Sequence, residues 1–205
     1  MQSKSTPSSG AAFIQRFIKH PAQVGTIAAT SPAVSRRLAE PIPETGEPLV
    51  VELGPGTGAV TEWIRRRLNG RGHHLAIEID PVFAEMLRTN YPDLDIAVAD
   101  AGNLSTLLAD RGLGKVDVVV SALPWTLLSD EQTRRILSAL AASMTPDGVF
   151  TTITYTTARM LPPWRRVLAA LNDTFESVEP SAAIWRNIPP AYVYEARRPR
   201  TQKPA

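Results

Sequence analysis

From residue 49 onward the chain alternates between short runs of apolar, β-branched residues and longer stretches with a helical repeat of apolar positions. The short runs predict strands, and the longer stretches predict amphipathic helices between them. The alternation predicts an α/β fold with a mostly parallel sheet and helices on both of its faces. The predicted strands are residues 49–53, 74–79, 95–99, 116–122 and 148–155, and the predicted helices are residues 58–69, 81–90, 103–110, 130–143 and 161–172.

Two more apolar segments follow the last of these helices. Residues 175–185 and 191–197 are joined by a proline-containing turn. A strand followed by a turn and another strand is the pattern of an antiparallel pair. We therefore expect this pair at one edge of the sheet, with the mostly parallel part beside it.

The N-terminal segment has a different character. Residues 1–10 are rich in Ser, Pro and Gly and predict a disordered tail. Residues 11–20 predict a short helix with an apolar face and a basic face, which suits either a membrane surface or the core of its own domain. Ser31 before Pro32 predicts the start of another helix. The predicted organisation is a tail over residues 1–10, a helical arm over 11–46, the main domain over 47–198 and a tail over 199–205.

Composition and charge narrow the function classes. The 205-residue chain has no cysteine, which excludes disulfides and thiolate metal sites, and the adjacent His73 and His74 do not suggest a metal centre. There is no apolar run of membrane-spanning length and no signal-peptide core, so we expect a cytoplasmic protein, at most peripheral to the inner membrane face.

Basic residues are concentrated at the two ends of the chain. Residues 1–39 hold five basic residues and no acidic one, and residues 159–205 hold eight basic and four acidic residues, although the net charge is only +2. Cationic flanks predict an anionic partner, which is either a lipid surface or nucleic acid.

A glycine-rich loop follows the first strand. Gly54, Gly56 and Gly58 occupy alternate positions, and Glu78 ends the second strand twenty residues after Gly58. Ligands of open parallel sheets bind beyond the carboxyl ends of the strands, where glycines allow close approach and an acid can accept hydrogen bonds from ribose hydroxyls. A dinucleotide could satisfy this pattern. Glu52 before the loop, however, disfavours a pyrophosphate and favours a cationic sulfonium nucleotide.

Three segments in register resemble the motifs of the class I S-adenosylmethionine-dependent methyltransferases. They are residues 52–58, residues 76–81 and residues 97–101. The resemblance implies a Rossmann-like sheet of seven strands, mostly parallel with an antiparallel last strand, and S-adenosylmethionine as cofactor. It assigns the ribose to Glu78 and the adenine amino group to Asp100. The full predicted cofactor set is Glu52, Gly54, Gly56, Gly58, Glu78, Asp100 and Ser121.

The methyl acceptor has to be inferred from the later strand ends. The loop after the fourth strand, residues 121–125, contains no amide or carboxylate to hold a planar exocyclic amine, which disfavours nucleobases. Tyr155 ends the fifth strand and is the predicted catalytic residue, because its hydroxyl or ring could position an amine. Arg186 and Asn187 in the late turn could clamp a phosphate. The predicted substrate site therefore consists of Trp125, Tyr155, Arg186 and Asn187.

The acceptor segments and the N-terminal arm together resemble the bacterial phospholipid N-methyltransferases. The resemblance implies stepwise methylation of phosphatidylethanolamine toward phosphatidylcholine, with the basic helix of residues 11–20 on an anionic membrane. Three alternatives stay open: a small-molecule N-, O- or C-methyltransferase of secondary metabolism, a ribosomal RNA adenine dimethyltransferase, and a non-catalytic membrane- or RNA-binding scaffold. The missing Asn-Leu-Pro-Tyr type motif separates the chain from the RNA enzymes and makes a nucleic-acid partner the weaker expectation.

Overall fold

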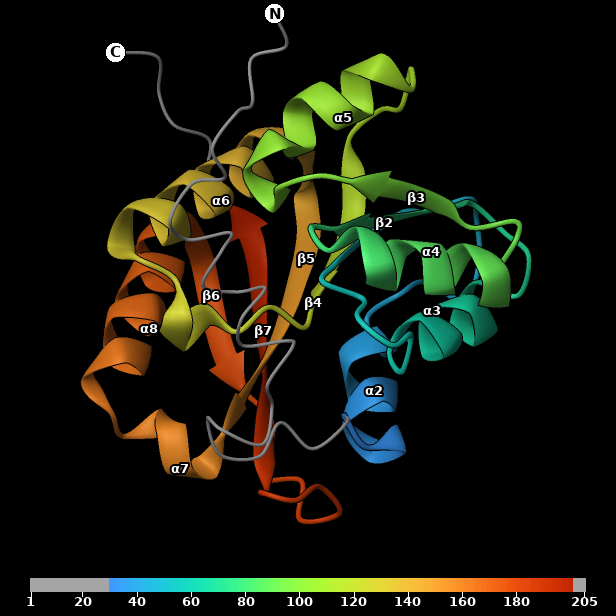
Figure 1. Ribbon diagram of the computed structural model, residues 1–205. Helices are drawn as coiled ribbons and strands as arrows, with labels where there is room; N and C mark the ends of the chain where they lie inside the picture. The colour runs from blue at the N-terminus through green and yellow to red at the C-terminus, as the bar shows by residue number, and fades with distance from the viewer. Residues whose placement is uncertain (1–29, 201–205) are drawn as a thin grey trace, which may run out of the picture.

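The computed structural model describes residues 30–200, which form a seven-stranded sheet between layers of helices (Figure 1). The strand order is β3-β2-β1-β4-β5-β7-β6, and β7 runs antiparallel to both of its neighbours. This confirms the predicted Rossmann-like sheet with its antiparallel last strand. The strands are β1 (Leu49–Leu53), β2 (His73–Glu78), β3 (Asp95–Val98), β4 (Val116–Ser121), β5 (Met144–Tyr155), β6 (Phe175–Pro180) and β7 (Ala191–Pro199).

The helices cover the two faces of the sheet. On one face, Val34 of α2 and Ile64 of α3 lie in one buried cluster. On the other face, Leu104 of α5, Leu137 of α6 and Leu171 of α8 lie in a second cluster. Because both faces are covered, the central strands β1 and β4 are apolar almost throughout. The helices are α2 (Pro32–Ala39), α3 (Thr61–Leu68), α4 (Pro81–Asn90), α5 (Leu104–Asp110), α6 (Asp130–Ser143), α7 (Thr156–Arg159) and α8 (Pro162–Thr174), with short 3₁₀ turns η2 (Ala101–Asn103) and η3 (Trp125–Leu127).

Two strand ends and one additional helix differ most from the sequence expectation. Strand β5 begins at Met144, four residues early, because Met144 pairs with Val116 ahead of a register shift in the β4–β5 ladder. Strand β6 ends at Pro180, after which only an isolated bridge between Ile184 and Ala191 continues the pairing. The segment after β5 forms the short helix α7, which the pattern did not predict.

Helix α2 belongs to the core of the domain. The Ser31 side chain caps it by accepting a hydrogen bond from Val34 N, as the Ser-Pro pair predicted. The Thr151 hydroxyl of β5 donates to Leu38 O at 2.9 Å, and Arg37 reaches Glu195 of β7 at 3.3 Å. The domain boundary at residue 46 stays a prediction. The predicted tail and the amphipathic helix of residues 11–20 lie outside the described residues, as does most of the C-terminal tail.

A helix can contact a membrane surface without being long enough to span the bilayer. Within residues 30–200, every helix is too short or too polar to cross a lipid bilayer.

Candidate active site

The glycine loop turns sharply between β1 and α3. Gly54 N donates to Ile77 O at 2.9 Å, which fixes the loop against the end of β2. Gly54 and Gly56 have φ values of +68° and +55°, which L side chains rarely adopt. A Cβ on Gly54 would lie 2.9 Å from Leu123 Cδ2, whereas a Cβ on Gly56 would meet nothing within 4 Å. The loop is therefore closely packed at its first glycine and open at its second.

Glu78 connects β2 to this loop. Its Oε2 accepts from Gly56 N at 3.0 Å and its Oε1 accepts from Asp80 N at 2.9 Å. The side chain is buried, and burial raises the pKa of the Glu78 carboxyl above its ordinary value. Each carboxylate oxygen keeps a second lone pair, so the group can also accept from two ribose hydroxyls. Asp80 caps α4 by accepting from Val82 N at 2.8 Å.

Glu52 lies behind the loop and is fully buried. Its Oε2 accepts from the Thr61 hydroxyl of α3 at 2.8 Å. The His74 Nε2 lies 3.2 Å from the same oxygen but off the direction of a hydrogen bond, and Oε1 has no partner among residues 30–200. A buried carboxylate with an unused oxygen suits a nearby cationic ligand. No role for His74 follows from the sequence pattern, although its place on β2 beside Val50 of β1 puts it next to Glu52.

Asp100 follows β3 and already has protein partners on both oxygens. Oδ1 accepts from Gly102 N at 2.7 Å, and Oδ2 lies 2.8 Å from Arg135 Nη2 of α6. Sequence reasoning missed Arg135, because a helix residue 35 positions away gives no local signal. The assignment of Asp100 to the adenine stays a prediction, and Arg135 is the residue that orients it.

Ser121 and Trp125 shape the loop after β4 from the inside. The Trp125 indole is 2% exposed and packs edge-to-face on Phe150 at 5.9 Å. Its Nε1 donates to Ser121 Oγ at 3.1 Å, and Leu123 N donates to the same oxygen at 3.3 Å. The predicted contacts of Ser121 with the cofactor and of Trp125 with the substrate stay predictions. Their position in the core assigns both residues to support of the loop that covers Gly54.

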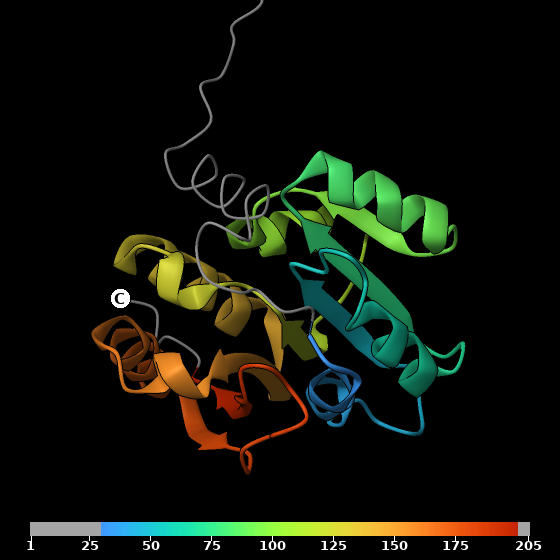
Figure 2. The ribbon, with the colours of Figure 1, turned by 60° about the horizontal axis from the view of Figure 1, so that its bottom comes forward.

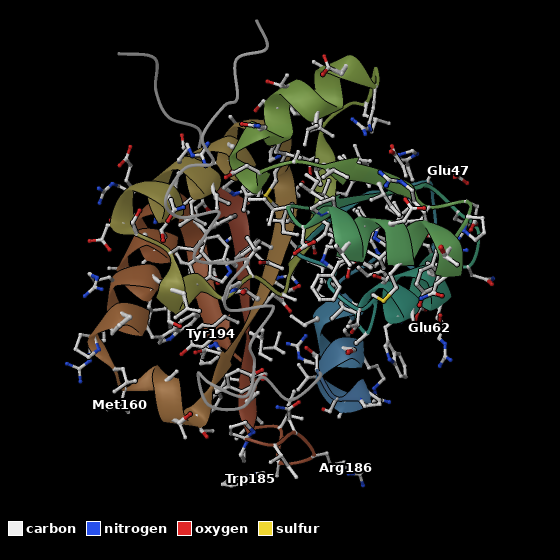
Figure 3. All side chains as sticks on the ribbon, in the orientation of Figure 1. Glu47, Glu62, Met160, Trp185, Arg186 and Tyr194 are labelled. Carbon is white, nitrogen blue, oxygen red and sulfur yellow. The ribbon has the colours of Figure 1, made fainter. Side chains whose placement is uncertain are left out.

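Of the predicted substrate residues, Tyr155, Arg186 and Asn187 lie where β5 ends and shortly before β7 begins, yet they differ in exposure. Tyr155 is half-buried, and burial raises the pKa of its hydroxyl. Arg186 is exposed and points away from the body of the protein (Figure 3). Asn187 is only 1% exposed, since its Oδ1 accepts from Ser31 N at 3.0 Å and its Nδ2 donates to Pro189 O at 2.6 Å. Its amide is thus occupied in joining α2 to the turn, and its predicted contact with substrate stays a prediction.

The fold and these residues together fit S-adenosylmethionine. The open space at Gly56 and the carboxylate of Glu78 would suit the ligand's tail and ribose hydroxyls, and the buried Glu52 would favour its positive charge from behind the loop. A family model described as a methyltransferase domain matches residues 50–148. The chain belongs to the S-adenosylmethionine-dependent methyltransferases, and S-adenosylmethionine is its methyl donor.

The chain also has a relative that matches nearly its full length. It is 32% identical over 188 residues to the ornithine lipid N-methyltransferase of Singulisphaera acidiphila, covering 90% of this chain and 94% of that protein. The ribosomal RNA small subunit methyltransferase A of Koribacter versatilis is 39% identical over only 80 residues, which is 37% of this chain and 27% of that protein.

Solved structures share the fold at low sequence identity. The O-methyltransferase from Bacillus cereus has a TM-score of 0.65 at 11% identity, with 94% of this chain and 92% of that chain covered. The N-methyltransferase NodS from Bradyrhizobium japonicum has a TM-score of 0.60 at 17% identity, with 81% and 94% covered. At these identities the likeness concerns the fold alone.

Proposed function

We propose that this enzyme methylates the amine of a lipid head group at a membrane surface. The observation that carries the proposal is the 32% identity to a lipid N-methyltransferase over 94% of that protein's length. The shared region spans the acceptor side of the fold as well as the cofactor half. By contrast, the ribosomal RNA relatives match less than half of this chain.

The loop after β4 supports an aliphatic amine as acceptor. It reads Ser121-Ala122-Leu123-Pro124-Trp125, so an alanine precedes Leu-Pro-aromatic where the RNA enzymes carry an asparagine. An sp³ amine does not need the planar amide contacts by which a nucleobase amine is held in place. Adenine methylation is the second candidate function, and this chain lacks the asparagine that it would use at this position.

The chain's own residues supply binding and alignment. Bound S-adenosylmethionine would supply a methyl group on its sulfonium, and methyl transfer to an unprotonated amine would form the N–C bond, break the S–C bond and release S-adenosylhomocysteine. Glu78 binds the ribose, the loop at Gly56 admits the amino-acid tail, and the buried charge of Glu52 favours a cationic ligand. Tyr155 lies where β5 ends; a tyrosine hydroxyl is protonated at neutral pH, and burial raises the pKa of this one further. Tyr155 therefore orients the amine by hydrogen bonding and does not act as its base.

Lipid mass spectrometry tests the acceptor class. We expect cells that express the chain to accumulate mono-, di- or trimethylated forms of phosphatidylethanolamine or of an ornithine lipid. The purified enzyme should transfer labelled methyl groups to the same lipid in mixed micelles. Cells expressing the Glu78→Gln variant provide the background. Unchanged lipids, together with methylation of ribosomal RNA or of a water-soluble amine, would contradict the proposal.

Removing the Tyr155 hydroxyl should reduce turnover without removing the ring. For Tyr155→Phe we expect about a fivefold lower kcat/KM for the lipid, since one hydrogen bond contributes about 1 kcal/mol. The affinity for S-adenosylmethionine, measured by calorimetry, should stay at the wild-type value. Tyr155→Ala should lower turnover further, because the ring also packs against the core beside Ile153. Wild-type turnover in both variants would exclude Tyr155 from the mechanism.

A further inference from the structure

Large apolar side chains project from one end of the molecule. Met160, Leu161, Trp185 and Ile188 are 67%, 52%, 76% and 78% exposed, and we refer to them as the rim residues. Met160 and Leu161 lie between α7 and α8, whereas Trp185 and Ile188 lie in the loop between β6 and β7. Figure 3 shows Met160 and Trp185 at the lower end of the protein, directed outward.

The two rim segments are joined where the sheet ends. Tyr155 pairs with Ala191 across β5 and β7, and Thr156 N donates to Pro190 O at 2.8 Å. Arg159 strengthens the junction, because its guanidinium lies 4.5 Å from the Tyr192 ring centroid. Helix α7 and the β6–β7 loop therefore emerge together, and both come forward in Figure 2. This is the carboxyl end of the parallel strands, which places the rim residues beside the proposed acceptor site.

The surroundings of the rim residues are cationic. Residues 151–172 and 180–194 contain no Asp or Glu. Arg165, in the first turn of α8, and Arg186 are exposed and have no ion pair within residues 30–200, unlike Arg166, which pairs with Asp130. Apolar side chains among unneutralised cations are the combination that binds an anionic bilayer surface, and a tryptophan suits the boundary between head groups and acyl chains.

We propose that the rim residues insert into an anionic lipid bilayer and dock the enzyme with its acceptor site toward the head groups. This proposal rests on the proposed function, because docking serves the enzyme only if its substrate is a lipid amine that reaches the site from the bilayer. A second copy of the chain is a poorer occupant. A two-fold contact would bring the rim segments of one copy, which carry Arg165 and Arg186 but no Asp or Glu, against the same segments of the other.

A double variant at the β6–β7 loop tests the docking surface. We expect Trp185→Ser with Ile188→Ser to weaken binding to vesicles of phosphatidylglycerol and phosphatidylcholine by at least about tenfold in a sedimentation assay. Val82→Ser is the matched control, because Val82 is 69% exposed and lies on α4 after β2, which β1 and β4 separate from β5 in the sheet. Arg186→Glu should weaken binding to these vesicles but not to vesicles of phosphatidylcholine alone.

The outcomes separate docking from catalysis. The double variant should lose methyl transfer to lipid in vesicles but keep it toward a dispersed, water-soluble short-chain lipid amine. Wild-type vesicle binding by the double variant would overturn the proposal, as would a wild-type protein that does not bind anionic vesicles. So would loss of a wild-type dimer in the variant, which would identify a second copy as the occupant. A wild-type enzyme that binds vesicles but methylates neither lipid would instead contradict the proposed function and leave the docking surface supported.

Discussion

Replacing Glu78 by Gln is expected to weaken S-adenosylmethionine binding roughly 100-fold, which corresponds to about 3 kcal/mol. The carboxylate accepts hydrogen bonds from Gly56 N and Asp80 N and has lone pairs left for two ribose hydroxyls. A glutamine amide can accept on one atom only, so its NH₂ group would face a donor that the carboxylate accommodates. The loss is therefore both direct, at the ribose, and indirect, at the glycine loop.

Calorimetry with S-adenosylmethionine or its demethylated product measures this loss. Glu85→Gln is the matched control, since Glu85 lies on the exposed side of α4 and pairs with Arg88. Its affinity should equal that of the wild type. If Glu78→Gln bound the cofactor as tightly as Glu85→Gln, the ribose assignment of Glu78 would be wrong.

The same carboxyl predicts a pH dependence of cofactor binding. Burial raises the pKa of Glu78, so this group becomes protonated at a higher pH than an ordinary glutamate with its value near 4.5. Ribose recognition needs the ionised form. Affinity should therefore fall as the pH drops through the raised pKa, and this step should be absent in Glu78→Gln. A wild-type profile that stays flat down to the ordinary glutamate range would contradict it.

The second large effect is expected for Trp125→Ala, and it concerns stability. The indole is fully enclosed between Phe150 and the loop after β4, and truncation of such a side chain costs about 3–5 kcal/mol of the free energy of unfolding. Because Leu123 N and Trp125 Nε1 share the Ser121 hydroxyl, the loop that covers Gly54 should loosen as well. We expect weaker cofactor binding at temperatures where the variant is still folded.

Trp125→Phe separates packing from the hydrogen bond. It keeps a ring against Phe150 but removes the donor to Ser121, and should cost about 1 kcal/mol. Denaturant unfolding followed by circular dichroism gives both free energies, and steady-state kinetics gives the KM for the lipid. A raised KM with wild-type stability in both variants would show that Trp125 is a substrate contact after all.

These two residues show how differently the sequence and the fold determine a site. Glu78 could be predicted because its position depends on local pattern, a strand followed by an acid at a fixed distance from a glycine loop. The direct bond from Gly56 N to Glu78 agrees with that expectation of proximity. Trp125 could not be placed in the same way, because an aromatic residue after a strand end is equally compatible with a binding surface and with a core.

Asp100 and Asn187 show which contacts depend on residues that are far apart in the sequence. Asp100 matched a motif, but its partner Arg135 comes from another helix and is visible only once α6 lies beside η2. Asn187 had the chemistry of a phosphate ligand, yet its amide oxygen is taken by Ser31, 156 positions earlier in the chain. No window of sequence contains both partners of such contacts.

The sequence by itself determined the alternation of strands and helices apart from α7, the antiparallel end of the sheet, the glycine loop and the position of Glu78 beside it. These features follow from hydrophobic periodicity and from backbone geometry at glycine, both of which act over a few residues. Only the tertiary structure decided that Trp125 supports the loop from the core, that Asn187 anchors α2, and that four apolar residues from two distant segments form one exposed rim. Burial and exposure depend on what packs against a residue, and that is fixed only when the whole chain has folded.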